Sequence, residues 1–255
     1  MKFSEYKIFK VKVTDVSRDE WRNYLYDRFH HKKYARIIIL TEKKFFQALF
    51  NRELFETINQ AEVVLCASSL VSWFSYHMYG KVIKPALAVT YVLDALSVAS
   101  ECQSMVSFYG STKNILFTTV QKVSKSFQGI RIVSAYPEKI ALKEMGKVFI
   151  AIRKTAANLG LFNLGNDKYQ ELWINKNFAL FKNGVVIGCD DSFEIIAGRK
   201  SVPPLSMQDK GLLGLHEILT HPFNIAKIFR FFVLIIMYFW YVVTGQQKKL
   251  GNNRS

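Results

Sequence analysis

The sequence predicts an α/β fold: a Rossmann-like, mostly parallel sheet with helices on both faces, followed by a C-terminal helical appendage. Short β-branched and apolar runs alternate with segments of helical periodicity from residue 36 to residue 188. Hydrophobic residues make up 50% of the 255 residues, which excludes disorder as the main state. The mean hydropathy of +0.07 excludes a multi-pass membrane protein, because such chains carry long apolar spans.

The first 66 residues are expected to supply three strands and one helix. Residues 1–13 alternate polar and apolar side chains, which predicts a first strand rather than a signal peptide. Residues 36–41 and 61–66 are buried strands by their β-branched content. Between them, Thr41 is a candidate N-cap for a helix whose apolar face holds Phe45, Phe46, Leu49, Phe50, Leu54 and Ile58.

The middle of the chain continues the alternation of helices and strands. Gly80 is expected to end the helix over residues 70–79, and a glycine-containing turn follows the strand over residues 105–109. The predicted helices are 70–79, 91–100, 113–126, 138–156 and 168–178, and the predicted strands are 105–109, 129–134, 159–164 and 184–188.

We divide the chain into an α/β domain over residues 1–196, a loop and hydrophobic appendage over 197–245, and a polar tail over 246–255. Every residue from 231 to 243 is apolar, and as a helix this stretch spans roughly 20 Å, short of the ~30 Å hydrocarbon core of a bilayer. Lys227 and Arg230 precede it. The sequence favours a helix that associates with the membrane surface, and the alternative is a helix that packs on the sheet or in an oligomer.

The net charge of +15 indicates a polyanionic partner: nucleic acid, anionic lipid or a phosphorylated substrate. No nucleic-acid motif accompanies it, so no specific nucleic acid is expected. The cysteines are widely spaced and without a CxxC pair, and the histidines have no metal-ligand spacing. We therefore expect free thiols, no metal and no cofactor.

Three polar motifs follow predicted strands. Gly110 and Ser111 lie between a strand and a helix, where free N–H groups suit a phosphate, although an ordinary turn has the same composition. Gln170 and Glu171 lie in the first turn of a helix, where a glutamate also favours the helix dipole without any function. Cys189 is followed by two aspartates, for which a helix cap is favoured over a cation site or a base.

These pieces, in this order, resemble the bacterial WecG/TagA/CpsF glycosyltransferase family over roughly residues 36–232. Leu164-Gly165 followed by Gln170-Glu171-Leu-Trp looks like the family's Leu-Gly-x-Pro-Lys-Gln-Glu-x-Trp. The stretch from Gly184 through Phe193 to Gly198 looks like its Gly-Val-Gly-x-x-Phe-Asp…Ala-Gly, with Glu194 in place of the aspartate.

The resemblance implies a transferase of the N-acetylmannosaminyltransferase type. Such a transferase would move an N-acetylhexosamine from a UDP-sugar to a polyprenyl-diphosphate-linked acceptor at the cytoplasmic face of the bacterial inner membrane, for cell-surface polysaccharide or teichoic-acid-like polymers. Assembly into an oligomer is left open. Lys227 and Arg230 would face lipid phosphates, and the nucleotide-sugar site would be lined by Thr41, Gly110, Ser111, Gly165, Asn166, Gln170 and Glu171.

The departures from the family pattern concern ionisable positions. The family's Asp-Gly, whose aspartate is the proposed base, falls on Ala67-Ser68, so the catalytic residue of this chain is unassigned. Loss of a general base costs roughly 10²–10⁴-fold in rate. Two hypotheses follow: an active glycosyltransferase with a displaced set of residues, or a catalytically inactive descendant that acts as a membrane-associated scaffold or regulator.

Overall fold

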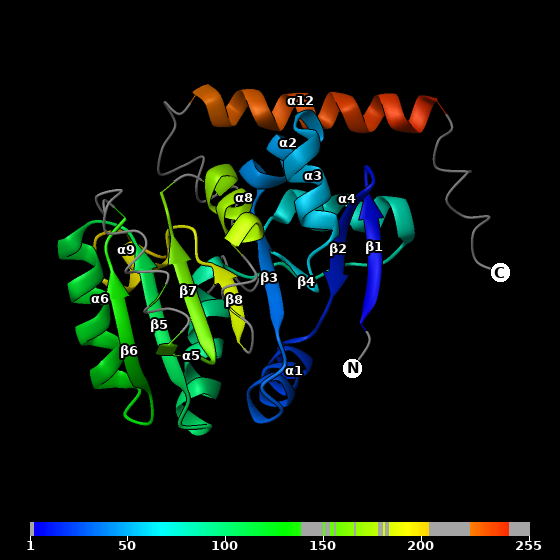
Figure 1. The fold of residues 1–255 in the computed structure, drawn as a ribbon. Coiled ribbons are helices and arrows are strands. Elements are labelled where there is room, and N and C mark those ends of the chain that lie inside the picture. Colours follow the sequence, from blue (N-terminus) through cyan, green and yellow to red (C-terminus); the bar gives the residue numbers. More distant parts are fainter. Residues whose placement is uncertain are drawn as a thin grey trace.

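The fold is built on one six-stranded sheet, whose strands are all parallel (Figure 1). The computed structural model describes residues 3–138, 150, 154–155, 157–165, 167–177, 181, 184–203 and 225–244. The strand order is β4-β3-β8-β7-β5-β6. The strands are β3 (Ala35–Leu40), β4 (Val63–Cys66), β5 (Met105–Gly110), β6 (Arg131–Tyr136), β7 (Leu159–Asn163) and β8 (Val185–Gly188). The predicted α/β class is confirmed.

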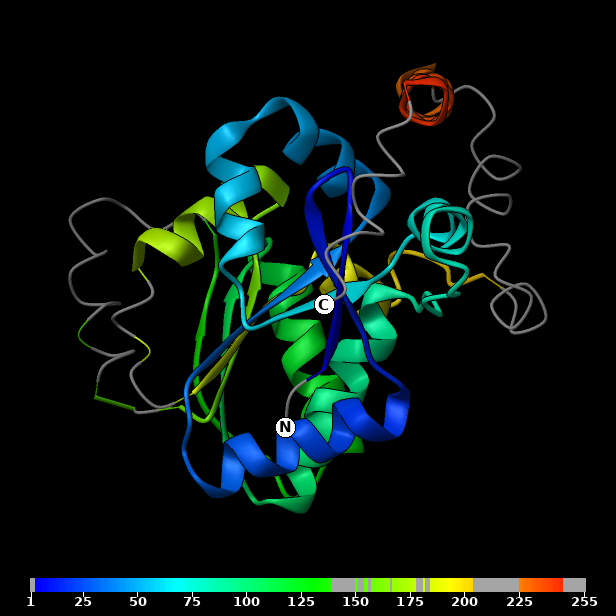
Figure 2. The ribbon, with the colours of Figure 1, turned by 90° about the vertical axis from the view of Figure 1, so that its right-hand side faces the viewer.

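Helices cover both faces of this sheet (Figure 2). One face carries α1 (Arg18–His30), α5 (Ala88–Glu101), α6 (Lys113–Ser126) and α9 (Ser192–Ile196). The other face carries α2 (Glu42–Phe50), α3 (Arg52–Asn59), α4 (Ser69–Tyr79) and α8 (Asp167–Asn177). The strand β3 shows why its sequence is continuously apolar: Ile37 and Ile39 belong to one core cluster, and Ile38 and Leu40 belong to the other.

The N-terminal segment is a β-hairpin rather than the single predicted strand. Strand β1 (Ser4–Ile8) pairs antiparallel with β2 (Val11–Asp15) in a separate two-stranded sheet. Phe9 and Lys10 form the two-residue loop with φ values of 46° and 68°, as a type I′ turn requires. Neither residue is a usual former of a type I′ turn. The alternation of polar and apolar residues over 1–13 therefore gave no sign of a turn and predicted one continuous strand.

The single helix predicted after Thr41 is two helices. Asn51 interrupts it, because its side chain accepts a hydrogen bond from the Leu54 backbone N–H at 2.8 Å and caps α3. Phe50, expected on the buried face, is 65% exposed at the end of α2. Helix α1 was not predicted, and a capping box of Ser17 and Glu20 begins it.

The other predicted elements within the described part of the chain are found within a few residues of their expected bounds. Gly80 ends α4 in the left-handed conformation, and α6 has its predicted bounds. Most of the predicted helix 138–156, residues 204–224 of the predicted loop and appendage, and the predicted tail 246–255 lie outside the described residues.

The hydrophobic appendage is helix α12 (Ile225–Val243), which lies across the top of α2 and α3 in Figure 1. Its inner side is buried: Leu234 is inaccessible, and the Tyr238 ring stacks on Phe74 with centroids 5.5 Å apart. Its outer side is exposed. The helix therefore packs on the domain along one side only. Among the described residues, no helix has the length and apolarity to cross a membrane.

Candidate active site

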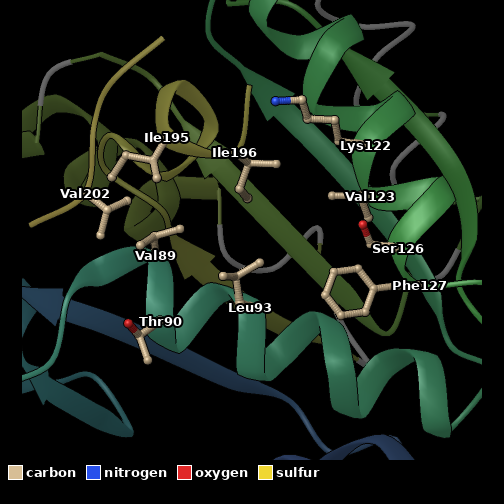
Figure 3. A pocket seen from close by; sticks show the side chains of 10 residues that line it. All are labelled: Val89, Thr90, Leu93, Lys122, Val123, Ser126, Phe127, Ile195, Ile196 and Val202. Atoms are coloured by element: carbon tan, nitrogen blue, oxygen red, sulfur yellow. The ribbon is translucent and has the colours of Figure 1, made fainter. Parts of the chain in front are cut away.

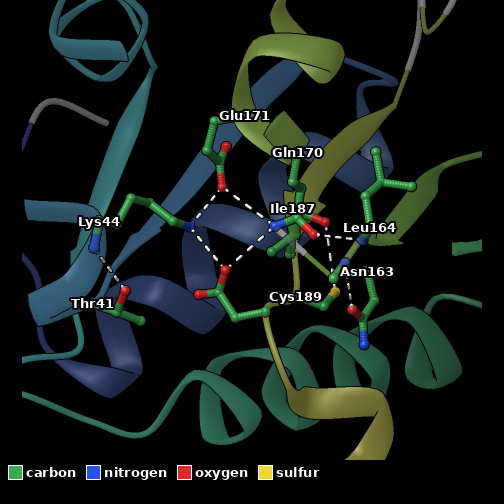
Figure 4. A network of polar contacts seen from close by, with 10 residues as sticks. Thr41, Lys44, Asn163, Leu164, Gln170, Glu171, Ile187 and Cys189 are labelled. Atoms are coloured by element: carbon green, nitrogen blue, oxygen red, sulfur yellow. Dashed lines mark hydrogen bonds and ion pairs between the residues drawn. The ribbon is translucent and has the colours of Figure 1, made fainter. Parts of the chain in front are cut away.

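Polar side chains gather where β3, β5, β7 and β8 end, at the edge of the sheet nearest α12. Open parallel sheets bind their ligands at this edge. The side chains form two adjoining groups. We call Lys44, Gln170, Glu171 and Asp190 the lysine cluster, and Ser111, Asn163 and Glu194 the serine cluster. Gln170 connects the two, because its Oε1 accepts a hydrogen bond from the backbone N–H of Leu164, the residue after Asn163 (Figure 4).

The lysine cluster is centred on the ammonium group of Lys44. Its Nζ lies 2.6 Å from Glu171 Oε1 and 3.0 Å from Asp190 Oδ1. Gln170 Nε2 donates to the same two oxygens, at 3.4 and 3.3 Å. The side chains of Lys44 and Glu171 are both inaccessible to solvent. One lysine of α2 thereby holds α8 and the end of β8 together at the sheet edge.

A glycine provides the space for this cluster. A Cβ on Gly188 would lie 2.5 Å from both Gln170 Nε2 and Glu171 Oε1. The next residues are Cys189 and Asp190, and Asp190 has a φ of 49°. Burial raises the pKa of the Cys189 thiol well above its ordinary value, with the Asp190 charge acting in the same direction. The Cys189 thiol is therefore protonated at neutral pH and is not a nucleophile.

The serine cluster lies where β5 and β7 end. Ser111 Oγ donates to Glu194 Oε1 at 3.0 Å, and Asn163 Nδ2 donates to Glu194 Oε2 at 2.7 Å. Gly110 is required here, because at a φ of 111° a Cβ would lie 1.9 Å from the Asn163 carbonyl oxygen. Ser111 follows it with a φ of 56°, a conformation that costs a non-glycine residue about 1 kcal/mol or more.

The structure places the predicted donor-site residues at this one edge. Ser111 is in the serine cluster and Gly110 precedes it, and Gln170 and Glu171 are in the lysine cluster. Thr41 caps α2, because its side chain accepts from the Lys44 backbone N–H at 3.3 Å. Gly165 lies two residues beyond the end of β7 and has a φ of 70°. Arg230 is on α12. Asn166 and the side chain of Lys227 lie outside the described part of the chain.

Sequence reasoning missed Lys44, Asn163 and the role of Asp190. Lysine is seldom buried, so its position on the buried side of α2 carried no signal. The two adjacent aspartates diverge: Asp190 joins the lysine cluster, whereas the Asp191 carboxylate pairs with Lys200. Asp191 stands at the N-cap of α9 as expected, but its side chain makes no capping hydrogen bond. No group of three or more metal-ligating side chains occurs in the described ranges.

Residue 67 follows β4 at the same edge, and it is the apolar Ala67. Its backbone N–H donates to the Leu40 carbonyl, and its methyl group packs against the core. Tyr91 lies beneath, with its hydroxyl donating to the Cys66 carbonyl at 2.9 Å. Position 67 therefore has no group that could accept a proton.

The sequence is similar to a known protein family and to a curated relative. The sequence profile of the glycosyl transferase WecG/TagA/CpsF family matches residues 6–253. A Bacillus spizizenii protein is 25% identical over 191 residues, which cover 74% of this chain and 73% of that protein. That protein is named N-acetylglucosaminyldiphosphoundecaprenol N-acetyl-β-D-mannosaminyltransferase.

Proposed function

The chain belongs to the WecG/TagA/CpsF family of glycosyl transferases, and we propose that it moves an N-acetylhexosamine from a UDP-sugar to a polyprenyl-diphosphate-linked acceptor. The observation that carries the proposal is the polar edge of the sheet, where the residues shared with the family motifs come together. The name of the Bacillus spizizenii relative supports both the kind of sugar and the kind of acceptor. The product would enter cell-surface polysaccharide or teichoic-acid-like polymer synthesis.

The donor would lie over the ends of β5 and β7. Glu194 is partly exposed there and is held in place by Ser111 and Asn163, so its remaining lone pairs can accept hydrogen bonds from donor hydroxyl groups. Gly165 is exposed and lacks a side chain, so it allows close approach of a ligand to the backbone. Gln170 and Glu171 are both buried, and we assign them the task of shaping the site through the lysine cluster.

The acceptor would be reached at a membrane surface, with the protein bound peripherally to the cytoplasmic face. The outer side of α12 supports this, because one continuous stripe of the helix is apolar and exposed. Arg230 and Lys227 lie on the same helix and are suited to lipid phosphates. The exposed stripe consists of Ile225, Phe229, Phe232, Ile236, Phe239, Trp240 and Val243.

The first test is nucleotide-sugar binding by the full chain. We expect UDP, UDP-GlcNAc and UDP-ManNAc to raise the melting temperature, and nucleotides with other bases to leave it unchanged. Transfer of radiolabelled sugar to a lipid-diphosphate acceptor then identifies the donor. Absence of any shift at millimolar UDP-sugar, together with absence of transfer, would contradict the proposal.

Ala67 favours a second candidate function, a non-catalytic scaffold among membrane-bound polymer enzymes. A general base contributes roughly 10²–10⁴-fold, and residue 67 supplies none. The substitution Ala67→Asp separates the two functions. Sugar transfer by the unaltered chain ends the scaffold hypothesis, whereas transfer that appears only with Ala67→Asp supports it.

A further inference from the structure

A groove of about 390 Å³ lies between α5 and α6 beside α9, on the side of the sheet away from α8 (Figure 3). Its volume falls within the range of roughly 300–1,000 Å³ that small-molecule sites occupy. Aliphatic and aromatic side chains form most of the wall. Its polar groups are the hydroxyl groups of Thr90 and Ser126 and the ammonium group of Lys122. The apolar lining is Val89, Leu93, Val123, Phe127, Ile195, Ile196 and Val202.

One cation stands at the rim of this groove. The Lys122 Nζ would lie 3.1 Å from a Cβ on Gly198, so the absence of a side chain at Gly198 leaves room for the ammonium group. Within the part of the chain that the structure describes, no carboxylate forms an ion pair with Lys122. An apolar groove with a single cation at its rim is complementary to an amphiphile with an anionic head group.

The groove and the candidate active site share the short helix α9. Ile195 and Ile196 of its wall follow Glu194 directly in the short helix α9. Glu194 in turn holds the serine cluster through Ser111 and Asn163. A ligand in the groove would therefore lie against the same helix that supplies the carboxylate of the site.

We propose that this groove binds the hydrocarbon next to the diphosphate of the lipid-linked acceptor, with Lys122 contacting a phosphate oxygen. The inference rests on the proposed function, which requires a polyprenyl-diphosphate acceptor. A free sugar or nucleotide fits the groove poorly. The groove offers only two hydroxyl groups and one ammonium group, so most polar atoms of such a ligand would be buried without hydrogen-bond partners. A prenyl chain needs no such partners and is stabilised by the apolar area that it buries.

The test uses farnesyl diphosphate as a soluble probe, with farnesol and inorganic pyrophosphate beside it. Leu93 is 39% exposed, so Leu93→Gln is expected to fold normally. We expect this variant to bind farnesyl diphosphate and farnesol about tenfold more weakly, in line with the loss of one apolar contact. Lys122→Gln should weaken the binding of farnesyl diphosphate and leave the binding of farnesol unchanged.

The matched control is Phe117→Gln, which removes an apolar side chain from α6 that is 63% exposed and outside the groove. It should bind farnesyl diphosphate as the wild type does. Equal binding by wild type and Leu93→Gln would overturn the proposal, as would pyrophosphate binding as tightly as farnesyl diphosphate. Self-association that Leu93→Gln abolishes, without prenyl binding by the wild type, would assign the groove to a second copy of the chain.

Sugar transfer separates this inference from the proposed function. The assay compares acceptors that carry a farnesyl chain or a butyl chain. Leu93→Gln should raise the KM for the farnesyl acceptor about tenfold without changing kcat. The KM for the butyl acceptor should be the same as in the wild type. If wild type and Leu93→Gln transfer sugar with the same KM for both acceptors, the groove does not bind the prenyl chain, and the proposed glycosyltransferase activity stands. Prenyl binding without transfer from any UDP-sugar rejects the glycosyltransferase instead.

Discussion

Lys44 is the residue on which the geometry of the candidate site depends most. Its ammonium group is buried and bonded to Glu171 and Asp190, which come from two other elements. Replacing Lys44 by Met keeps most of the length of the side chain and removes the cation that Glu171 and Asp190 both contact. We expect Lys44→Met to lower the free energy of unfolding by roughly 3–5 kcal/mol, measured by urea denaturation. The double variant Lys44→Met/Glu171→Gln should recover part of this loss.

The control for this prediction is the preceding residue. Lys43 is exposed on the same helix, so Lys43→Met removes an equal charge and should change the free energy of unfolding by no more than about 0.5 kcal/mol. If Lys44→Met and Lys43→Met prove equally stable, the lysine cluster is not a stabilising feature of the fold.

At the scale of the element, α12 has one side packed on the domain and one side exposed. Leu234 and Tyr238 pack on the domain, whereas Ile236 on the opposite side is 64% exposed. We expect Ile236→Glu to leave the melting temperature within about 2 °C of wild type and to abolish most binding to phospholipid vesicles, measured by co-sedimentation. Leu234→Ala should instead destabilise the protein by roughly 2–4 kcal/mol, because it opens a cavity under the helix.

These two variants separate membrane contact from protein packing. Ile236→Glu that still sediments with vesicles would show that the outer stripe of α12 does not contact lipid. A large fall in melting temperature for Ile236→Glu would show that the stripe is covered by protein, and assembly between copies would then be the better explanation of its apolar character.

At the scale of the whole molecule, the sequence predicted the elements whose signals are local. Strand β3 was predictable because both of its faces are buried, and the end of α4 because Gly80 adopts the left-handed conformation. The hairpin was missed because Phe9 and Lys10 occupy positive φ angles where Asn and Gly are expected. The burial of Lys44 depends on Glu171, 127 residues away, and no local pattern reports such a pairing.

Gly110, Ser111, Gln170 and Glu171 lie at one edge of the sheet, as the predicted strand ends imply, because glycine turns and strand ends are local features. They did not indicate what fills the space between them. Asn163 and Glu194 are 31 residues apart and meet only because β7 and β8 are adjacent and both end at this edge. Chemistry built from such pairs requires the three-dimensional structure.

The net charge of +15 belongs to the whole molecule, and we expect it to make the proposed membrane binding depend on salt in a way that α12 alone would not. Lysine and arginine near an anionic surface contribute about 1 kcal/mol each, and this attraction is screened beyond roughly 10 Å at 0.1 M salt. We expect binding to vesicles with anionic lipid to fall at least tenfold between 50 and 500 mM NaCl. Binding to zwitterionic vesicles should be weaker and nearly independent of salt, because it rests on the apolar stripe. Equal salt dependence for both kinds of vesicle would indicate that the charge is directed at another partner, such as the phosphates of the donor or acceptor, rather than at the lipid surface.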